Sequence, residues 1–259
     1  MIKPVLHYFN LADEVVSFST TRHGGVSKGK LATLNINPHR GDEPSAVAEN
    51  LQAVAAEIGV QADKVIRLHQ IHETHCLTVT DAFFRLSVAE QYEMEKGKDA
   101  VVTDCRNVCI GVHTADCVPV LFYDPVHHAI GAAHAGWRGT VQRIAQHTLR
   151  KMTELYGTDP KELKAVVGPC ISQKNFEVGQ EVYDAFSAAG FPMERIARMY
   201  EKWHINLPLC NQLQLEELGV PTANILQSGI CTYDNASDFF SARILKEGFG
   251  TIYTGIALK

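Results

Sequence analysis

The sequence lacks three features that would each place the protein in a specialised class. Lys and Arg number 24 against 29 Asp and Glu, a net charge of −5, which argues against a nucleic-acid-binding surface. No apolar run approaches the roughly 18 residues that span a bilayer. The first residues do not follow the basic, apolar, small-residue order of a secretory signal peptide. We therefore expect a soluble cytoplasmic protein with neither nucleic-acid nor membrane partners.

The cysteines also lack any recognisable framework. There are seven of them, an odd number, and no two have the CxxC spacing. This pattern excludes a structural zinc finger and a thioredoxin-like redox pair, and it indicates free thiols in a reducing compartment. One or two of those thiols can therefore carry chemistry.

What is present is enough apolar sequence for a substantial core. The chain has 259 residues and is 46% hydrophobic, with no repeat and no linker-like segment, so we expect a single domain over residues 1–259. Its fold class is predicted as α/β of the α+β type, with mixed β-sheets flanked by helices. Helical spacing indicates helices at 44–58, 140–156, 179–189 and 207–218. Strands are expected at 15–21, 64–70, 74–81, 100–104, 108–114, 118–124, 129–135, 163–172 and 251–258.

The densest β region also contains a thiol and an imidazole in suggestive positions. Cys117 lies in a tight link between two β-rich segments, and His134 lies near the end of another apolar run, AIGAAHA. The ends of neighbouring strands can meet at one edge of a sheet. We expect these two side chains to meet there and to need a third partner from elsewhere.

The third partner is sought in the segment LHQIHETH, which contains His69, His72 and His75. On an unbroken strand, His69 and His75 would face away from the side of His72. The spacing is not that of a zinc-binding HExxH helix. Local pattern alone leaves the choice among the three open.

Three separated motifs resolve this choice by resemblance. QIH at 70–72, TADCVPV at 114–120 and HAGWRGT at 134–140 resemble the metal-site motifs of the YfiH family, also called multicopper polyphenol oxidoreductases or DUF152. The similarity extends over most of the chain, through STTRHGGVS at 19–27, TLNINPHRGD at 33–42, GPCIS at 168–172, NLPLCNQLQLEELGV at 206–220 and FFSAR at 239–243.

The resemblance implies a zinc ion bound by His72, Cys117 and His134. It implies purine-nucleoside chemistry, namely phosphorolysis of adenosine, inosine or methylthioadenosine and deamination of adenosine, so the expected partners are a purine nucleoside and phosphate. It also implies a mixed α/β fold shared with a toxin family of cysteine hydrolases. Some bacterial members are instead described as editing factors for a peptidoglycan precursor. A monomer or small homo-oligomer is expected.

The donor set agrees with this implied site. Two imidazoles and one thiolate suit zinc, and three protein ligands leave the fourth tetrahedral position open, as in catalytic sites. Zinc can lower the pKa of bound water to about 7, and zinc sites with His and Cys ligands deaminate nucleobases. Copper would also bind such donors, since it outcompetes zinc in raw affinity, and we expect that binding to be adventitious.

Four further residues are candidates for substrate or phosphate binding. Arg138 lies where a glycine-rich turn leads into a predicted helix, whose first N–H groups attract anions. Arg243 follows an aromatic pair in a matched motif, and Asn35 and Arg40 belong to a polar loop long enough to be functional.

Two other functions remain open from the sequence. A metal-free cysteine hydrolase would use Cys117 as nucleophile and His134 as base, for example as an amidase that edits a peptidoglycan precursor. A copper-binding polyphenol oxidase is the third possibility. It fits less well, because the twelve histidines include no His-x-His pair of the kind that multicopper oxidases use.

Overall fold

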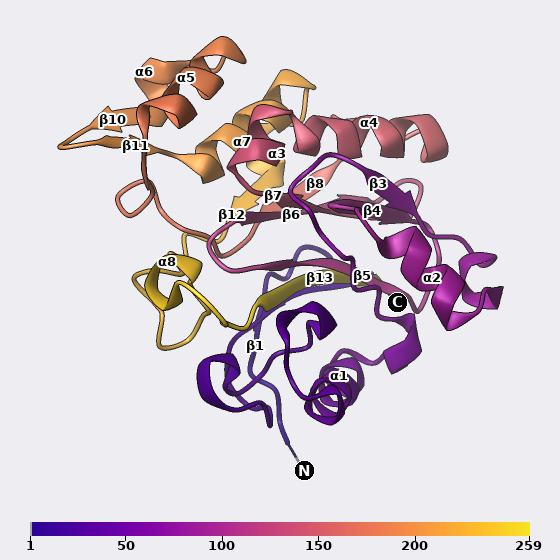
Figure 1. The fold of residues 1–259 in the computed structure, drawn as a ribbon. Helices are drawn as coiled ribbons and strands as arrows, with labels where there is room; N and C mark the ends of the chain where they lie inside the picture. Colours follow the sequence, from indigo (N-terminus) through magenta and orange to yellow (C-terminus); the bar gives the residue numbers. More distant parts are fainter. Residues whose placement is uncertain (1) are drawn as a thin grey trace.

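Two β-sheets lie face to face, with helices on the outer side of each, as Figure 1 shows. The computed structural model describes residues 2–259. The six-stranded sheet has the order β12 (Ile225–Gln227), β8 (Lys164–Val167), β6 (Val118–Asp124), β7 (Ala129–Ala135), β4 (Ala100–Thr103) and β3 (Cys76–Thr78). The four-stranded sheet has the order β1 (Leu6–Tyr8), β2 (Val15–Thr20), β13 (Ile252–Leu258) and β5 (Cys109–Thr114).

Apolar side chains lie on both faces of each sheet, and this explains why the strands have continuous hydrophobic runs. On β6, Val120 and Phe122 point toward the helices, while Leu121 and Tyr123 point toward the second sheet. Most strand pairs are antiparallel, but β12 runs parallel to β8 and β3 runs parallel to β4. The predicted class, mixed sheets flanked by helices, is confirmed.

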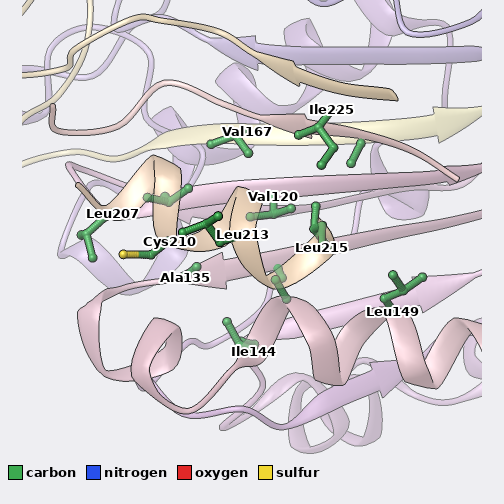
Figure 2. Close-up of a cluster of buried hydrophobic side chains, with 14 of the residues drawn as sticks. Val120, Ala135, Ile144, Leu149, Val167, Leu207, Cys210, Leu213, Leu215 and Ile225 are labelled. Atoms are coloured by element: carbon green, nitrogen blue, oxygen red, sulfur yellow. The ribbon is translucent and has the colours of Figure 1, made fainter. Parts of the chain in front are cut away.

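The outer face of the six-stranded sheet is covered by α4 (Ile144–Tyr156) and α7 (Leu207–Glu217). Figure 2 shows their apolar side chains against the strands, with Ile144 and Leu149 from α4 and Leu213 and Leu215 from α7. This cluster is the largest part of the core. It holds β6 and β7 rigidly from one side, and these two strands carry part of the candidate site.

The four-stranded sheet is covered by α1 (Pro44–Ile58), which was predicted correctly. Pro44 occupies its first turn, where the missing N–H is no loss. Gly59 ends it with a left-handed φ of 75° and donates its N–H back to the last turn. Leu51 and Val54 pack into the cluster between α1 and the sheet.

Three predictions of secondary structure were wrong. The strand expected at 163–172 ends at Val167, and beyond it only Cys170 forms an isolated bridge. The expected strand at 64–70 forms only single bridges, Val65 with Cys109 and His69 with Lys96. The expected helix at 140–156 is two helices, α3 (Trp137–Val141) and α4, because Arg143 between them has a φ of 65°.

The remaining elements lie around this framework. A small sheet of β10 (Ala197–Met199), β11 (Trp203–Ile205) and β9 (Glu177–Val178) projects at one end, beside α5 and α6 (Figure 1). The other helices are α2 (Val88–Glu95), α5 (Gln180–Ala188), α6 (Met193–Ile196) and α8 (Ala242–Leu245). Among residues 2–259, no helix combines the length and apolarity needed to cross a bilayer.

Candidate metal centre

Three side chains of metal-ligand type converge at one edge of the six-stranded sheet. One ligand atom from each of His72, Cys117 and His134 lies within 4.8 Å of the others. The Sγ of Cys117 is 4.0 Å from Nε2 of His72, and the rings of His72 and His134 are 4.7 Å apart at 73°. Atoms this close can share one ion after small side-chain adjustments.

The hairpin of β6 and β7 brings two of these residues together. Pro119 pairs with His134 and Val118 pairs with Ala135, so Cys117 comes just before β6 on the strand edge where β7 ends. The link that carries Cys117 crosses from β5 in the four-stranded sheet to β6 in the other sheet. Both flanking strands are buried, which restricts how far the thiol can move.

His72 reaches the site from a turn rather than from a strand. Its φ is 66°, in the left-handed region that only a few per cent of non-glycine residues adopt. The alternation that would apply on a strand therefore does not hold in this segment. His69 and His75 are not part of this group of three. His69 stacks on His39 in the wall of the adjoining cavity, and His75 pairs with Glu73 at 3.0 Å.

One buried carboxylate holds both histidines in place, and the sequence patterns did not reveal it. Asp99 accepts hydrogen bonds from the backbone N–H groups of Ile71, His72 and Glu73, at 3.1, 3.0 and 2.9 Å. It also accepts Nδ1–H of His134 at 2.7 Å. This leaves Nε2 of His134 free to bind a metal, the arrangement typical of metal-ligating histidines.

The charge of His134 and those of Cys117 and Asp99 stabilise one another, and they favour the thiolate form of Cys117 that binds a metal. Burial raises the pKa of the Cys117 thiol, but His134 and His72 outweigh it and lower that pKa to about 6. Burial lowers the pKa of His134, but the Cys117 thiolate and Asp99 raise it to about 9. Burial also opposes the charge on Asp99, yet His134 and the backbone N–H groups hold its pKa below the usual value. The thiol is therefore largely ionised near neutral pH.

A glycine at the end of β7 leaves room for the three side chains. A Cβ at Gly136 would lie 2.9 Å from Cδ2 of His72 and 3.1 Å from Sγ of Cys117. Both distances are shorter than ordinary carbon–carbon and carbon–sulfur contacts. A side chain at position 136 would therefore press against both His72 and Cys117 and push them away from each other.

The three side chains form part of the wall of an open cavity of ≈340 Å³, within the size range of small-molecule sites. Other segments contribute polar side chains to the same cavity: His39, Arg40, His69, Gln70, His113 and Thr251. Phe249 supplies an aromatic ring. A ligand in this cavity would lie directly against the candidate metal ligands.

Of the four residues predicted to bind substrate or phosphate, the structure brings only Arg40 to this cavity. Arg138 is exposed and stacks on Trp137 at 4.2 Å. Arg243 is exposed and donates to the carbonyl of Glu177 at 3.0 Å. Asn35 is fully buried, and it donates to Asp42 at 2.9 Å inside the long early loop.

Comparison with known proteins identifies the family. The family model described as multi-copper polyphenol oxidoreductase laccase matches residues 16–259. The chain belongs to this family. The family membership that the three motifs indicated is thereby confirmed.

Members with assigned names cover nearly the whole chain. A purine nucleoside phosphorylase from Bacteroides thetaiotaomicron is 41% identical over 99% of this chain and 97% of its own length. An adenosine deaminase named RL5, from an unknown prokaryotic organism, is 35% identical over 98% of both chains.

Solved structures of the family share the fold. YfiH from Bacillus licheniformis has a TM-score of 0.91 and 31% identity, covering 99% of this chain and 97% of its own. YlmD from Geobacillus stearothermophilus has a TM-score of 0.89 and 29% identity, covering 97% and 94%.

The family's description names copper, and the described residues can be compared with what that chemistry requires. Among the described residues, His72, Cys117 and His134 are the only group of three or more ligand-type side chains close enough to hold an ion. Oxidases of the multicopper kind need several copper ions, and the sequence has no His-x-His pair. The centre is compatible with a single metal ion bound by two nitrogens and one sulfur.

Proposed function

We propose that the protein is a zinc-dependent purine nucleoside enzyme. Relatives named purine nucleoside phosphorylase and adenosine deaminase support the class of substrate. The observation that carries the proposal is that His72, Cys117 and His134 lie within 4.8 Å of one another in the wall of a ligand-sized cavity. The proposed reactions are phosphorolysis of adenosine, inosine or methylthioadenosine, and deamination of adenosine.

The residues of the centre fit zinc. His72 and His134 supply imidazole nitrogens, Cys117 supplies a thiolate, and such a set leaves one tetrahedral position open. When bound, zinc would supply Lewis-acid chemistry at the cavity wall. Asp99 determines which nitrogen of His134 can bind the metal. Nδ1 is occupied by its hydrogen bond to Asp99, so Nε2 remains as the ligand atom.

The chain's own groups have distinct tasks in this scheme. Asp99 orients one ligand through its ring and another through the backbone of the 71–73 turn. Gly136 allows His72 and Cys117 to approach. The cavity positions the nucleoside against these groups, and its buried framework keeps them in place, which lowers the entropic cost of reaction.

One observation favours a second candidate, a cysteine hydrolase. The pKa of Cys117 is lowered to about 6 against the opposing effect of burial, and a thiolate at neutral pH is also what a nucleophile requires. In that scheme Cys117 attacks an amide carbonyl and His134 acts as acid and base, as in an enzyme that edits a peptidoglycan precursor.

Removal and return of the metal separates the two candidates. The protein is incubated with adenosine, with and without phosphate, before chelation, after chelation and after zinc is restored. Deamination yields inosine, which phosphorolysis can convert to hypoxanthine, whereas phosphorolysis of adenosine yields adenine. Inosine plus hypoxanthine therefore measures deamination, and adenine measures phosphorolysis of adenosine. We expect chelation to abolish deamination and zinc to restore it, with alkylation of Cys117 faster in the chelated protein because coordination occupies the sulfur.

The cysteine hydrolase makes the opposite prediction. Its activity survives chelation, and alkylation abolishes it whether or not metal is present. Deamination at the full rate in protein shown to be free of metal would overturn the zinc-dependent function.

A further inference from the structure

Two cysteines that the proposed function does not use lie side by side at a second cavity. Cys170 follows β8 and Cys231 follows β12, and these neighbouring strands run parallel. The two residues form a parallel bridge: the N–H of Cys170 donates to the carbonyl of Ile230 at 3.2 Å, and the N–H of Thr232 donates to the carbonyl of Cys170 at 3.0 Å. Residues paired directly across a ladder present their side chains on the same face, so the two thiols are neighbours.

The backbone spacing of this bridge suits a disulfide. Neighbouring strands lie about 4.7 to 4.9 Å apart, and the Cα atoms of disulfide-bonded cysteines lie about 4.4 to 6.8 Å apart. Both cysteines are free thiols in the structure. A bond between them therefore needs side-chain rotation and a small movement of two adjacent segments, and no refolding.

The two thiols differ in their surroundings. The sulfur of Cys231 accepts the backbone N–H of Ser172 at 3.4 Å and a side-chain N–H of Asn175 at 3.2 Å. Hydrogen bonds donated to a sulfur favour its thiolate form. Burial raises the pKa of the Cys170 thiol, and the neighbouring Cys231 raises it further. Cys231 is therefore the better nucleophile, and Cys170 is the thiol that reacts second.

A cavity gives small molecules access to this pair. It has a volume of ≈310 Å³, its wall includes Cys170, Cys231 and Lys174, and none of the described residues that line it is Asp or Glu. The two cysteines are only 4% and 8% exposed. A peroxide can enter such a cavity, whereas a thiol of another protein cannot reach sulfurs this deeply buried. The reaction partner of each cysteine is therefore the other one.

We propose that Cys170 and Cys231 are an oxidation site, and that they close to a disulfide when the protein meets hydrogen peroxide. The Cys231 thiolate attacks one peroxide oxygen, the O–O bond breaks and hydroxide leaves, so that Cys231 becomes a sulfenic acid. The sulfur of Cys170 then attacks the sulfenic sulfur, and the thiol proton leaves with the hydroxyl group as water. Overall, two thiols and one peroxide give one disulfide and two waters.

The disulfide would act on the candidate metal centre through Asp116, the residue before Cys117. The residue after each cysteine bonds to Asp116: the N–H of Ile171 donates to its carbonyl at 2.9 Å, and the hydroxyl of Thr232 donates to its carboxylate at 2.7 Å. Asp116 has a left-handed φ of 84°, which its surroundings have to maintain. Closing the disulfide moves both donors. The oxidised protein should therefore bind zinc more weakly, an effect that rests on the zinc-dependent function proposed above.

Peptide mapping by mass spectrometry tests the oxidation site without any turnover. Purified protein is treated with excess peroxide, alkylated and digested. We expect a disulfide between the peptides of Cys170 and Cys231, and a phosphine reductant should reverse it. Cys170→Ser should stop at a sulfenic acid on Cys231, which a dimedone probe detects. Cys105→Ser removes a half-buried thiol outside the pair, so it is the matched control and should form the disulfide as the parent does.

The outcomes distinguish the oxidation site from the function proposed above. The Cys170–Cys231 disulfide in protein that binds no zinc would support the site even though the zinc-dependent function fails. Two free thiols after excess peroxide, or a sulfinic acid on Cys231 that has not joined Cys170, would overturn the site.

Zinc affinity tests the coupling to the metal centre. In competition with a chromophoric chelator, we expect the disulfide-linked protein to bind zinc about tenfold more weakly, with parent affinity restored after reduction. Cys231→Ser, which cannot form the disulfide, should show no such loss after peroxide treatment. Equal zinc affinity in the reduced and the disulfide-linked protein would overturn the coupling.

Discussion

At the scale of single residues, Asp99 has the largest influence on the candidate metal centre. It is completely buried, and its carboxylate accepts four hydrogen bonds that reach the turn of His72 and the ring of His134. A neutral amide in its place keeps the size but loses two acceptor positions and the charge. The two imidazoles would then lose their common support.

We therefore predict that Asp99→Asn weakens zinc binding about 10- to 100-fold, the usual effect of losing a carboxylate behind a metal-ligating histidine. Competition with a chromophoric chelator measures this affinity. Asp104→Asn, an exposed acid just after β4, is the control and should bind zinc normally. Parent-like zinc affinity in folded Asp99→Asn protein would contradict the role of Asp99.

The three candidate ligands could be chosen from the sequence, but the carboxylate that holds two of them in place could not. Spacing alone did not separate His72 from His69 and His75, and only the matched motifs did so. Asp99 looks like an ordinary polar residue before a strand, because its role depends on N–H groups 26 to 28 residues earlier in the chain. Burial of an acid is visible only in three dimensions.

At the scale of elements, the junction of β7 and α3 decides whether the centre can form. Gly136 ends the strand and precedes the helix, and a side chain there would collide with His72 and Cys117. Gly139 lies one turn further on, where an added Cβ would meet its neighbours at ordinary distances of 3.4 to 3.5 Å. Alanine substitutions at these two glycines therefore form a test and its matched control.

Gly136→Ala should lose most of its zinc, because the new methyl group separates the ligands. Gly139→Ala should keep its zinc and gain up to about 1 kcal/mol of stability from better helix propensity. Metal content after dialysis and the melting temperature measure the two effects. Equal zinc content in both variants would show that the approach at Gly136 is not required.

The elements themselves were mostly predictable, and the failures have local causes. Helix α1 was predicted because helical spacing of its apolar residues agrees with a proline at its start and a glycine at its end, all within one short segment. The break before α4 could not be predicted, because the left-handed Arg143 is held by Glu217, the carbonyl of Ala189 and the ring of Phe191. The segment 64–70 has the alternation of a strand but no partner strand along its length.

At the scale of the whole molecule, the cavity is assembled from segments far apart in the sequence. Residues 37–40, 68–72, 113–117 and 242–251 meet at the edge shared by the two sheets. The acidic composition of the chain gave no hint of a cavity lined by five histidines and one arginine. The cavity thus brings the candidate metal ligands and side chains from distant parts of the chain into one wall.

The central claim is that His72, Cys117 and His134 bind one zinc ion, and the metal content of purified protein tests it most directly. Elemental analysis of the parent and of Cys105→Ala, a half-buried cysteine away from the site, should give about one zinc per chain. Cys117→Ala should be folded, as judged by circular dichroism, and should have lost most of its zinc. Full zinc occupancy in Cys117→Ala would contradict the claim.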